Sequence, residues 1–135
     1  MTDLATLDFR LGFFKLIVRD LEGMIAFYQR TFGFEIRNRI EIEGAQEAML
    51  ALPEKAFTLI LYRWTDDRAI AIGTGYGPLG FMVADTDTAY AHAVANGARE
   101  KLPPFDVEGA RIAFIDDPEG HEIEIVQVVQ SGEAA

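Results

Sequence analysis

The chain has 135 residues, half of them apolar, which is enough for one compact domain with a sizeable core. Its 22 acidic against 12 basic residues give a net charge of −10, which opposes binding to nucleic-acid phosphates or anionic lipids. Cysteine is absent, which excludes disulfides and thiol chemistry and fits a reducing compartment. There is no signal-peptide pattern and no apolar run of membrane-spanning length. We therefore expect a soluble, cytoplasmic protein without nucleic-acid or membrane partners.

The first half of the sequence predicts a strand, a helix and three further strands. Residues 12–18 form a short apolar, β-rich run. Apolar residues then recur at helical spacing, with Asp20 as the predicted N-cap and Gly33 as the end of the helix. The remaining strands of this βαβββ unit are expected at 34–42, 45–52 and 56–64.

The second half predicts the same order after a connector at 65–75. A strand at 76–84 precedes a helix at 86–96, which Asp85 caps and Gly97 ends. Three strands then complete the unit, at about 98–102, 109–116 and 120–128, and a tail at 130–135 has no core-forming residue.

A shift of 65 residues superposes the two halves. It carries four residues onto identical ones, Gly12, Val18, Asp20 and Ala26 onto Gly77, Val83, Asp85 and Ala91. This repeat indicates an internal duplication. The fold class it predicts is α+β, with module one at about 10–64 and module two at about 76–129 inside a single domain, 1–135.

Alternation along the strands predicts a pocket between the modules. Side chains two residues apart share a face of a sheet, so Phe13, Lys15 and Ile17 lie opposite to the core residues Leu16 and Val18. We expect two curled mixed sheets with helices on their convex sides and a cleft between their other faces. The residues predicted to line this cleft are Phe13, Ile17, Phe57, Leu59, Leu61, Arg63, Pro78, Met82 and Glu122.

Three segments resemble a known family. The run from Val18 to Tyr28 (Val-Arg-Asp-Leu-Glu-Gly-Met-Ile-Ala-Phe-Tyr) and the run from Asp117 to Ile125 (Asp-Pro-Glu-Gly-His-Glu-Ile-Glu-Ile) resemble the vicinal oxygen chelate superfamily. That superfamily includes glyoxalase I, extradiol dioxygenases and the fosfomycin and bleomycin resistance proteins. The segment Gly73-Thr-Gly-Tyr-Gly-Pro78 is similar to the glyoxalase I branch. The resemblance spans about residues 10–129 and implies paired βαβββ modules around a cleft.

The resemblance also implies where metal ligands would stand. In metal-dependent members, one ligand lies five residues before the valine that ends each module's first strand and another on each module's last strand. Those positions are Phe13, Leu59, Pro78 and Glu124, of which only Glu124 has a lone pair to donate. A catalytic metal typically needs three protein ligands, so we expect no metal and no cofactor. Ile17 replaces the basic glutathione contact of glyoxalase I, which also argues against glutathione.

Lys15 and Glu124 are the remaining candidates for chemistry. They could form an ion pair, within a chain or across a dimer, that fills the place of the lost metal. Alternatively, Lys15 could hold a ligand carboxylate or enolate oxygen while Glu124 acts as a general base. His92 and His121 are expected at the surface.

Three functions follow from these residues. The leading prediction is a metal-independent protein of the glyoxalase and bleomycin-resistance type that binds a small, largely apolar molecule, as a homodimer. The main alternative is a metal-free isomerase or lyase that uses Glu124 with Lys15. The third is a partner protein without a ligand, its cleft filled by Phe13, Leu59 and Leu61.

Overall fold

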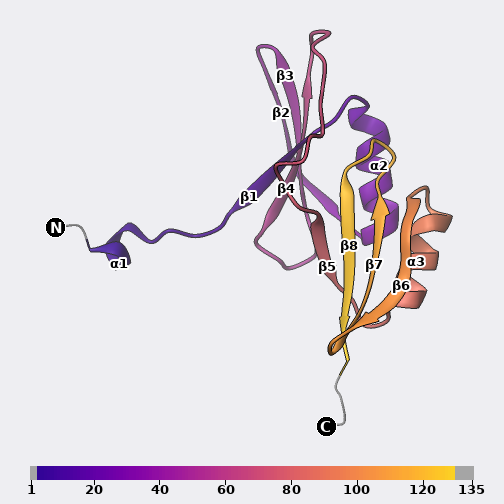
Figure 1. Cartoon of the computed structure of the whole chain (residues 1–135). Coiled ribbons are helices and arrows are strands. Elements are labelled where there is room, and N and C mark those ends of the chain that lie inside the picture. The colour runs from indigo at the N-terminus through magenta and orange to yellow at the C-terminus, as the bar shows by residue number, and fades with distance from the viewer. Residues whose placement is uncertain (1–2, 130–135) are drawn as a thin grey trace. The chain divides into compact units, whose positions relative to one another are not determined.

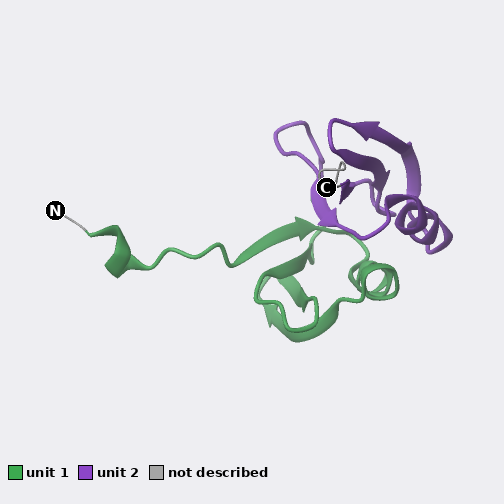
Figure 2. Cartoon of the chain, turned by 90° about the horizontal axis from the view of Figure 1, so that it is seen from below, with its two compact units in different colours: residues 1–68 green, residues 69–135 purple. Residues whose placement is uncertain are grey.

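The computed structural model describes residues 3–129, and the predicted tail at 130–135 lies outside them. The chain divides into two compact units, residues 1–68 and 69–135. Figure 2 shows the same make-up in each: a curved sheet with one long helix beside it. The two four-stranded sheets have the orders β1-β4-β3-β2 and β5-β8-β7-β6, which confirms the predicted α+β class and its repeated unit.

Unit one begins with a short helix that the sequence did not predict. The segment before β1 carries this helix, α1, because Asp3 caps its first turn by accepting a hydrogen bond from Ala5 N. The elements of the unit are α1 (Leu4–Leu7), β1 (Phe13–Ile17), α2 (Leu21–Phe32), β2 (Glu35–Ile42), β3 (Ala45–Ala51) and β4 (Thr58–Trp64). We call the sheet of this unit sheet A.

Helix α2 begins and ends where the sequence predicts. The Asp20 carboxylate accepts from Gly23 N at 3.0 Å, and Gly33 closes the helix in the left-handed region with φ +81°. Glu22 of α2 receives two hydrogen bonds from Arg39 of β2, at 2.7 and 2.9 Å. Arg39 is the register partner of Ala48, so α2 covers the face of sheet A that holds Ala48. The core of this unit lies there, with Leu16, Leu50, Leu59 and Leu61 buried.

Unit two repeats this arrangement in sheet B. Its elements are β5 (Leu79–Met82), α3 (Thr86–Ala95), β6 (Arg99–Val107), β7 (Ala110–Asp116) and β8 (Glu122–Val128). Strand β6 extends to Val107, five residues beyond its predicted end at 102, because it pairs with β7 as far as the turn at 108–109. Figure 1 shows α3 lying along β6 and β7.

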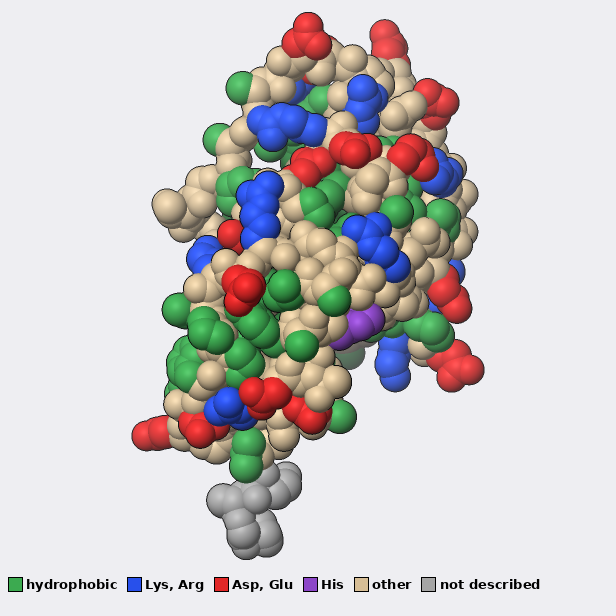
Figure 3. Space-filling model, turned by 90° about the vertical axis from the view of Figure 1, so that its right-hand side faces the viewer, with side chains coloured by type: hydrophobic (Ala, Val, Ile, Leu, Met, Phe, Trp, Pro, Cys, Tyr) green, Lys and Arg blue, Asp and Glu red, His purple; other side chains and the backbone are tan. Residues whose placement is uncertain are grey.

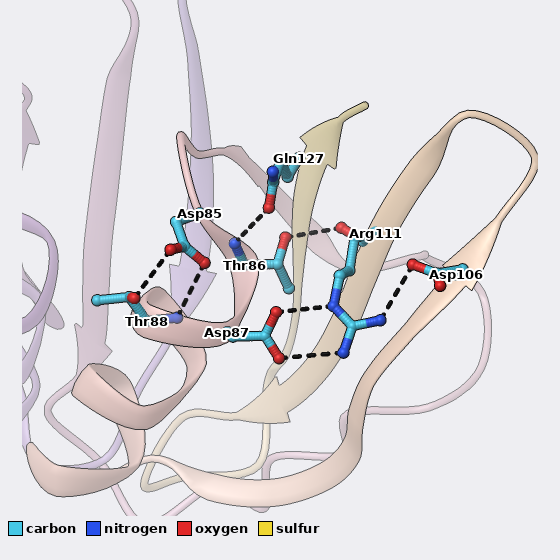
Figure 4. A network of polar contacts seen from close by, with 7 residues as sticks. All are labelled: Asp85, Thr86, Asp87, Thr88, Asp106, Arg111 and Gln127. Carbon is cyan, nitrogen blue, oxygen red and sulfur yellow. Dashed lines mark hydrogen bonds and ion pairs between the residues drawn. The ribbon is translucent and has the colours of Figure 1, made fainter. Parts of the chain in front are cut away.

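A polar network fixes α3 to sheet B (Figure 4). The Arg111 guanidinium donates to both oxygens of Asp87, at 2.7 and 3.1 Å, and to Asp106 at 3.0 Å. The fully buried Thr86 donates its N–H to Gln127 Oε1 at 2.9 Å and its hydroxyl to the Arg111 carbonyl at 2.7 Å. Arg111 therefore lies on the helix-covered face of sheet B.

The predicted facing of the β4 side chains is wrong, because the register of β4 differs by one residue from the register expected. Phe14 pairs with Leu59 and Lys15 with Ile60, so Leu59 shares the α2-covered face with Phe14. In unit two, Gly80, which the shift of 65 equates with Lys15, pairs with Glu124. The counterpart of Glu124 is therefore Ile60, at an offset of 64.

Turn length explains this difference. Six residues, 52–57, join β3 to β4, whereas five, 117–121, join β7 to β8. Because side chains alternate along a strand, one extra turn residue moves every following side chain to the other face. Leu59, Leu61 and Arg63 thus lie on the helix-covered face of sheet A, and Phe57 precedes the strand as an exposed residue. They do not share the face of Phe13.

Candidate functional site

The four positions of the expected metal site offer one usable ligand. With the register corrected, they are Phe13, Ile60, Pro78 and Glu124. Phenyl, sec-butyl and pyrrolidine groups have no lone pair for a metal. Within residues 3–129, no group of three or more histidine, aspartate or glutamate side chains is gathered closely enough to hold a metal ion. The residues present do not fit a catalytic metal of the kind that the family's metal-dependent members use.

Lys15 has a partner that the sequence did not suggest. Its Nζ lies 3.5 Å from Glu47 Oε2 and 4.8 Å from the centre of the Tyr62 ring. The Glu47 side chain is 9% exposed and that of Lys15 is 39% exposed. A buried carboxylate needs a compensating charge, and Lys15 supplies it while its ammonium keeps access to water.

These three residues share the helix-free face of sheet A, which is the face opposite α2. Glu47 and Tyr62 are register partners on β3 and β4, and Ile17 of β1 pairs with Tyr62. Phe13, Lys15 and Ile17 therefore lie on this face, as predicted. The sequence signal for Glu47 was its place in an alternating strand at 45–52, two residues from Met49 on the same face.

An aromatic pair continues this face toward the end of β4. The Tyr62 and Trp64 rings meet edge-to-face, with centroids 4.7 Å apart. The Arg68 guanidinium lies 3.7 Å from the Trp64 ring centre and forms a 2.7 Å ion pair with Asp66. Arg68 and Tyr62 thus already contact the Trp64 indole, which leaves less of its surface free to stack on a ligand.

Glu124 lies on the helix-free face of sheet B, as predicted. It pairs with Gly80 of β5 and Phe114 of β7, and it is half-buried. Among the residues that the structure describes, its carboxylate has no hydrogen bond or ion pair. Gly80 leaves open space beside Glu124, because a Cβ at residue 80 would meet no atom within 4 Å. The Glu124 carboxylate therefore has no competing partner among the described residues.

Glu122, on the same face, is part of a separate ion-pair group. Lys101 Nζ lies 3.2 Å from Glu122 Oε2 and 3.6 Å from Asp116 Oδ1. The hydrogen bond to Glu122 raises the pKa of Lys101 above its ordinary value. The Lys101 ammonium neutralises one of the carboxylates of Asp116 and Glu122. Glu124 follows two residues further along β8, so this face of sheet B carries a net negative charge.

The ion pair predicted between Lys15 and Glu124 would link residues of different units, and it stays a prediction. Lys15 belongs to unit one and Glu124 to unit two. The structure adds that Lys15 is charge-compensated inside its own unit by Glu47. Lys15 therefore does not need Glu124 to satisfy its charge.

His121 is not the exposed turn residue that the sequence suggested. Its side chain is 12% exposed, and Nδ1 lies 2.8 Å from Oδ2 of the fully buried Asp117. The other oxygen of Asp117 accepts from the backbone N–H groups of Glu119 and His121. These bonds hold the 117–121 turn that sets the register of β8. His92 is exposed on α3, as predicted.

A shallow depression lies where the first turn of α2 meets β2 and β3. Its volume is about 190 Å³, and the residues around it are Leu21, Glu22, Arg39, Ile40, Glu41, Gln46 and Glu47. Two of its charged residues, Arg39 and Glu22, form an ion pair, and the hydrogen bond from Arg39 lowers the pKa of Glu22 below its ordinary value. The depression contains none of the residues predicted for the pocket.

The charged surface gives no support to a polyanionic partner. On the face drawn in Figure 3, acidic and basic side chains are interspersed and do not gather into a basic patch. None of the described helices is long and apolar enough to cross a membrane.

Sequence comparison agrees with this architecture of two βαβββ units. The sequence model of the Glyoxalase/Bleomycin resistance protein/Dioxygenase superfamily matches residues 10–125. The chain belongs to this superfamily.

Relatives in the superfamily include several lactoylglutathione lyases. The lactoylglutathione lyase of Escherichia coli O157:H7 is 27% identical over 130 residues, covering 91% of this chain and 96% of the relative. A probable chloroplastic lactoylglutathione lyase of Arabidopsis thaliana is 30% identical over 117 residues, 82% of this chain and 33% of the relative.

Solved structures show the same fold. A V278E mutant of glyoxalase I from Zea mays superposes with a TM-score of 0.79 at 26% identity, covering 89% of this chain and 45% of the maize chain. This chain thus corresponds to about half of the maize enzyme. A glyoxalase family protein from Bacillus cereus gives a TM-score of 0.77 at 21% identity, covering 89% of this chain and 94% of that chain.

Proposed function

We propose that this chain is a metal-independent small-molecule binding protein of the glyoxalase and bleomycin-resistance type. In this proposal the two units act as one domain, 1–135, and a small, largely apolar ligand lies between the helix-free faces of sheets A and B. The observation that supports it is the donor set: Phe13, Ile60 and Pro78 stand at three of the four positions where the family resemblance implies metal ligands. Glu124 alone cannot assemble a catalytic metal centre.

The proposed ligand contacts differ from those that the sequence suggested. Phe13, Ile17, Ile60 and Tyr62 supply apolar surface from sheet A, and Pro78, Met82 and Val126 supply it from sheet B. Glu124 is the polar group that would orient the ligand. Because Glu47 already neutralises Lys15, an anionic ligand gains less from Lys15 than an unpaired lysine would offer.

A metal-free isomerase or lyase is the second candidate, and one observation favours it. Glu124 is half-buried and has no partner among the described residues, so its carboxylate is available as a general base. Lys15 would then stabilise the enolate oxygen. An anion at that place would have to compete with Glu47 for the ammonium.

The test combines metal analysis with a screen for ligands. The purified protein is dialysed against Ni²⁺ or Zn²⁺ and analysed by mass spectrometry of its metals, then assayed for S-lactoylglutathione formation. We expect well under one metal per chain and no turnover. One tightly bound metal per chain with turnover would contradict the proposal and favour the activity named for its relatives.

The ligand screen separates the two candidates. Thermal shifts are measured with a panel of small apolar amines, neutral compounds and carboxylic acids, first with the native protein and then with Glu124→Gln. A binding protein shows a stabilising compound that the protein does not convert. Conversion of a bound compound, lost in Glu124→Gln while binding is retained, would establish the enzyme.

A further inference from the structure

The Trp64 ring at the end of β4 holds the guanidinium group of a nearby residue of the same chain. The Arg68 guanidinium lies 3.7 Å from the centre of this ring. It also donates two parallel hydrogen bonds to Asp66, from Nε to Oδ1 at 2.9 Å and from Nη2 to Oδ2 at 2.7 Å. Stacking on an aromatic face and pairing with both oxygens of a carboxylate are the two ways in which proteins recognise a planar guanidinium. Trp64 and Asp66 together offer both.

The spacing of aspartate and arginine along the chain does not by itself produce this geometry. Asp8 and Arg10 are also two residues apart, and both are exposed. Their contact is a single ion pair of 3.4 Å, from Arg10 Nε to Asp8 Oδ2. The forked pair of hydrogen bonds is found at Asp66, where the guanidinium also stacks on an indole.

A second ring on the same face of sheet A also has a cation beside it. Lys15 Nζ lies 4.8 Å from the centre of the Tyr62 ring, and this ring meets Trp64 edge-to-face at 4.7 Å. Glu47 compensates the charge of Lys15. This end of the helix-free face therefore presents two adjacent aromatic rings to cations, each cation with its own carboxylate.

Arg68 is the one of these two cations that a ligand can displace. Lys15 belongs to β1, which is paired with β4, whereas Arg68 lies in the segment 65–78, which has no helix or strand. The Arg68 and Asp66 side chains are 48% and 56% exposed, so solutes can reach them. The hydrogen bonds from Arg68 lower the pKa of Asp66 to about 2, which keeps this carboxylate charged at neutral pH. Departure of Arg68 would leave a negative charge that another cation can compensate.

We propose that Trp64 and Asp66 form a binding site for small molecules that carry a guanidinium group, and that Arg68 occupies this site until such a ligand displaces it. The forked geometry favours guanidinium over alkylammonium ions, which pair with a carboxylate as point charges. Because a ligand must compete with Arg68, removal of Arg68 should tighten binding. The proposal uses residues of unit one alone and does not depend on a ligand between sheets A and B.

Titration of the full chain with propylguanidinium, a truncated arginine side chain, is the test. Trp64 is the chain's only tryptophan, so its fluorescence reports directly on the site. The native protein and Arg68→Ala are compared at constant ionic strength, since salt screens exposed charges. Arg68→Ala should bind the probe about 3- to 30-fold more tightly, which is the combined effect of an exposed cation–π contact and an exposed ion pair. Arg68→Gln, which keeps a longer side chain without the charge, should behave in the same way.

The controls separate the site from general effects of charge. Arg10→Ala is the matched variant, because it removes an exposed arginine at the same spacing from an aspartate, and it should leave the affinity unchanged. The double variant Asp66→Asn, Arg68→Ala should lose the gain in affinity, because the amide has no charge to pair with the probe. Butylammonium should bind Arg68→Ala more weakly than propylguanidinium does. Far-ultraviolet circular dichroism checks that each variant is folded.

Three outcomes would overturn the proposal. If the native protein, Arg68→Ala and Arg68→Gln bind propylguanidinium equally, Arg68 serves only to stabilise its own turn. Binding that survives Asp66→Asn would exclude the carboxylate as a ligand contact. Equal affinity for butylammonium and propylguanidinium would show that the site does not select a guanidinium group.

Discussion

At the residue scale, the main finding is that Lys15 belongs to an ion pair with the buried Glu47. The pair lies on the face of sheet A where a ligand is proposed, and Tyr62 provides an aromatic surface 4.8 Å from the ammonium. Removing one member of such a pair leaves an uncompensated charge, which costs more than the pair itself contributes. Substitution of Lys15 therefore tests stability as well as binding.

Lys15→Met should lower the free energy of unfolding by roughly 1–3 kcal/mol, because the Glu47 carboxylate stays buried without its cation. The double variant Lys15→Met, Glu47→Met should recover most of this loss. Urea denaturation of the native, single and double variants measures both effects. Equal stability of native protein and Lys15→Met would show that the ion pair contributes nothing.

Glu124 could be predicted from the sequence, whereas Glu47 and Ile60 could not. The motif from Asp117 to Ile125 and strict alternation put Glu124 on the right face, and the structure confirms that face. Ile60 was missed because the register of β4 cannot be read from that strand alone. The register depends on the turn at 52–57, which is one residue longer than the turn at 117–121 in the other unit. Glu47 was missed because its partner lies 32 positions away.

At the element scale, the start of α3 depends on a side chain from β8. The N–H of Thr86 is a first-turn donor without a partner inside the helix, and Gln127 accepts it at 2.9 Å. The Thr86 side chain and backbone are fully buried, so water cannot replace this bond.

Gln127→Leu should destabilise the protein by about 1–3 kcal/mol, because it leaves a buried N–H unsatisfied. Gln29→Leu, on the exposed side of α2, is the control and should change stability by at most about 0.5 kcal/mol. Both are measured by chemical denaturation. Similar small effects for the two variants would refute the role of Gln127.

The bridge between α3 and β7 should make stability depend on acid pH. Hydrogen bonds from Arg111 hold the pKa of Asp87 below its ordinary value of 3.8. A carboxyl whose pKa is lower in the folded state stabilises that state above the unfolded pKa and loses this effect as the pH falls through the folded value.

In Asp87→Asn, the loss of stability below about pH 4 should therefore be less steep than in the native protein. Unfolding free energies measured from neutral pH down to about pH 2.5 on both proteins test this. Asp67→Asn, in the exposed segment after β4, is the control. If the stability of Asp87→Asn falls below pH 4 as steeply as that of the native protein, the bridge between Asp87 and Arg111 does not cause the pH dependence.

At the scale of the whole molecule, the two units repeat one fold but no longer carry the same chemistry. Both sheets have the same strand order and a helix on one face. Of the four equivalent ligand positions only Glu124 is polar, and the chain as a whole belongs to a superfamily that includes lactoylglutathione lyases. The proposed loss of metal binding is therefore caused by three side chains, Phe13, Ile60 and Pro78, and not by a change of fold.

Restoring those three side chains should restore a metal site if the proposed cleft exists. The variant Phe13→His, Ile60→Glu, Pro78→His, together with the native Glu124, offers four ligands of the kinds that Ni²⁺ and Zn²⁺ prefer. We expect about one bound metal per chain by calorimetry. The matched variant with Leu59→Glu in place of Ile60→Glu keeps only three of the four ligands and should bind the metal more weakly, since residue 59 faces α2. Metal uptake by the Leu59→Glu variant alone would refute the register assigned here.

The sequence by itself determined the repeated unit, the N-caps of both long helices, the superfamily and the residue types at the predicted metal-ligand positions. These features follow from local patterns: apolar periodicity, Asp and Gly at helix ends, and residue types without lone pairs. The tertiary structure alone decided that Ile60 and not Leu59 matches Glu124, and that Glu47 compensates Lys15. Both depend on which strands pair and in what register, and pairing joins residues far apart in the chain.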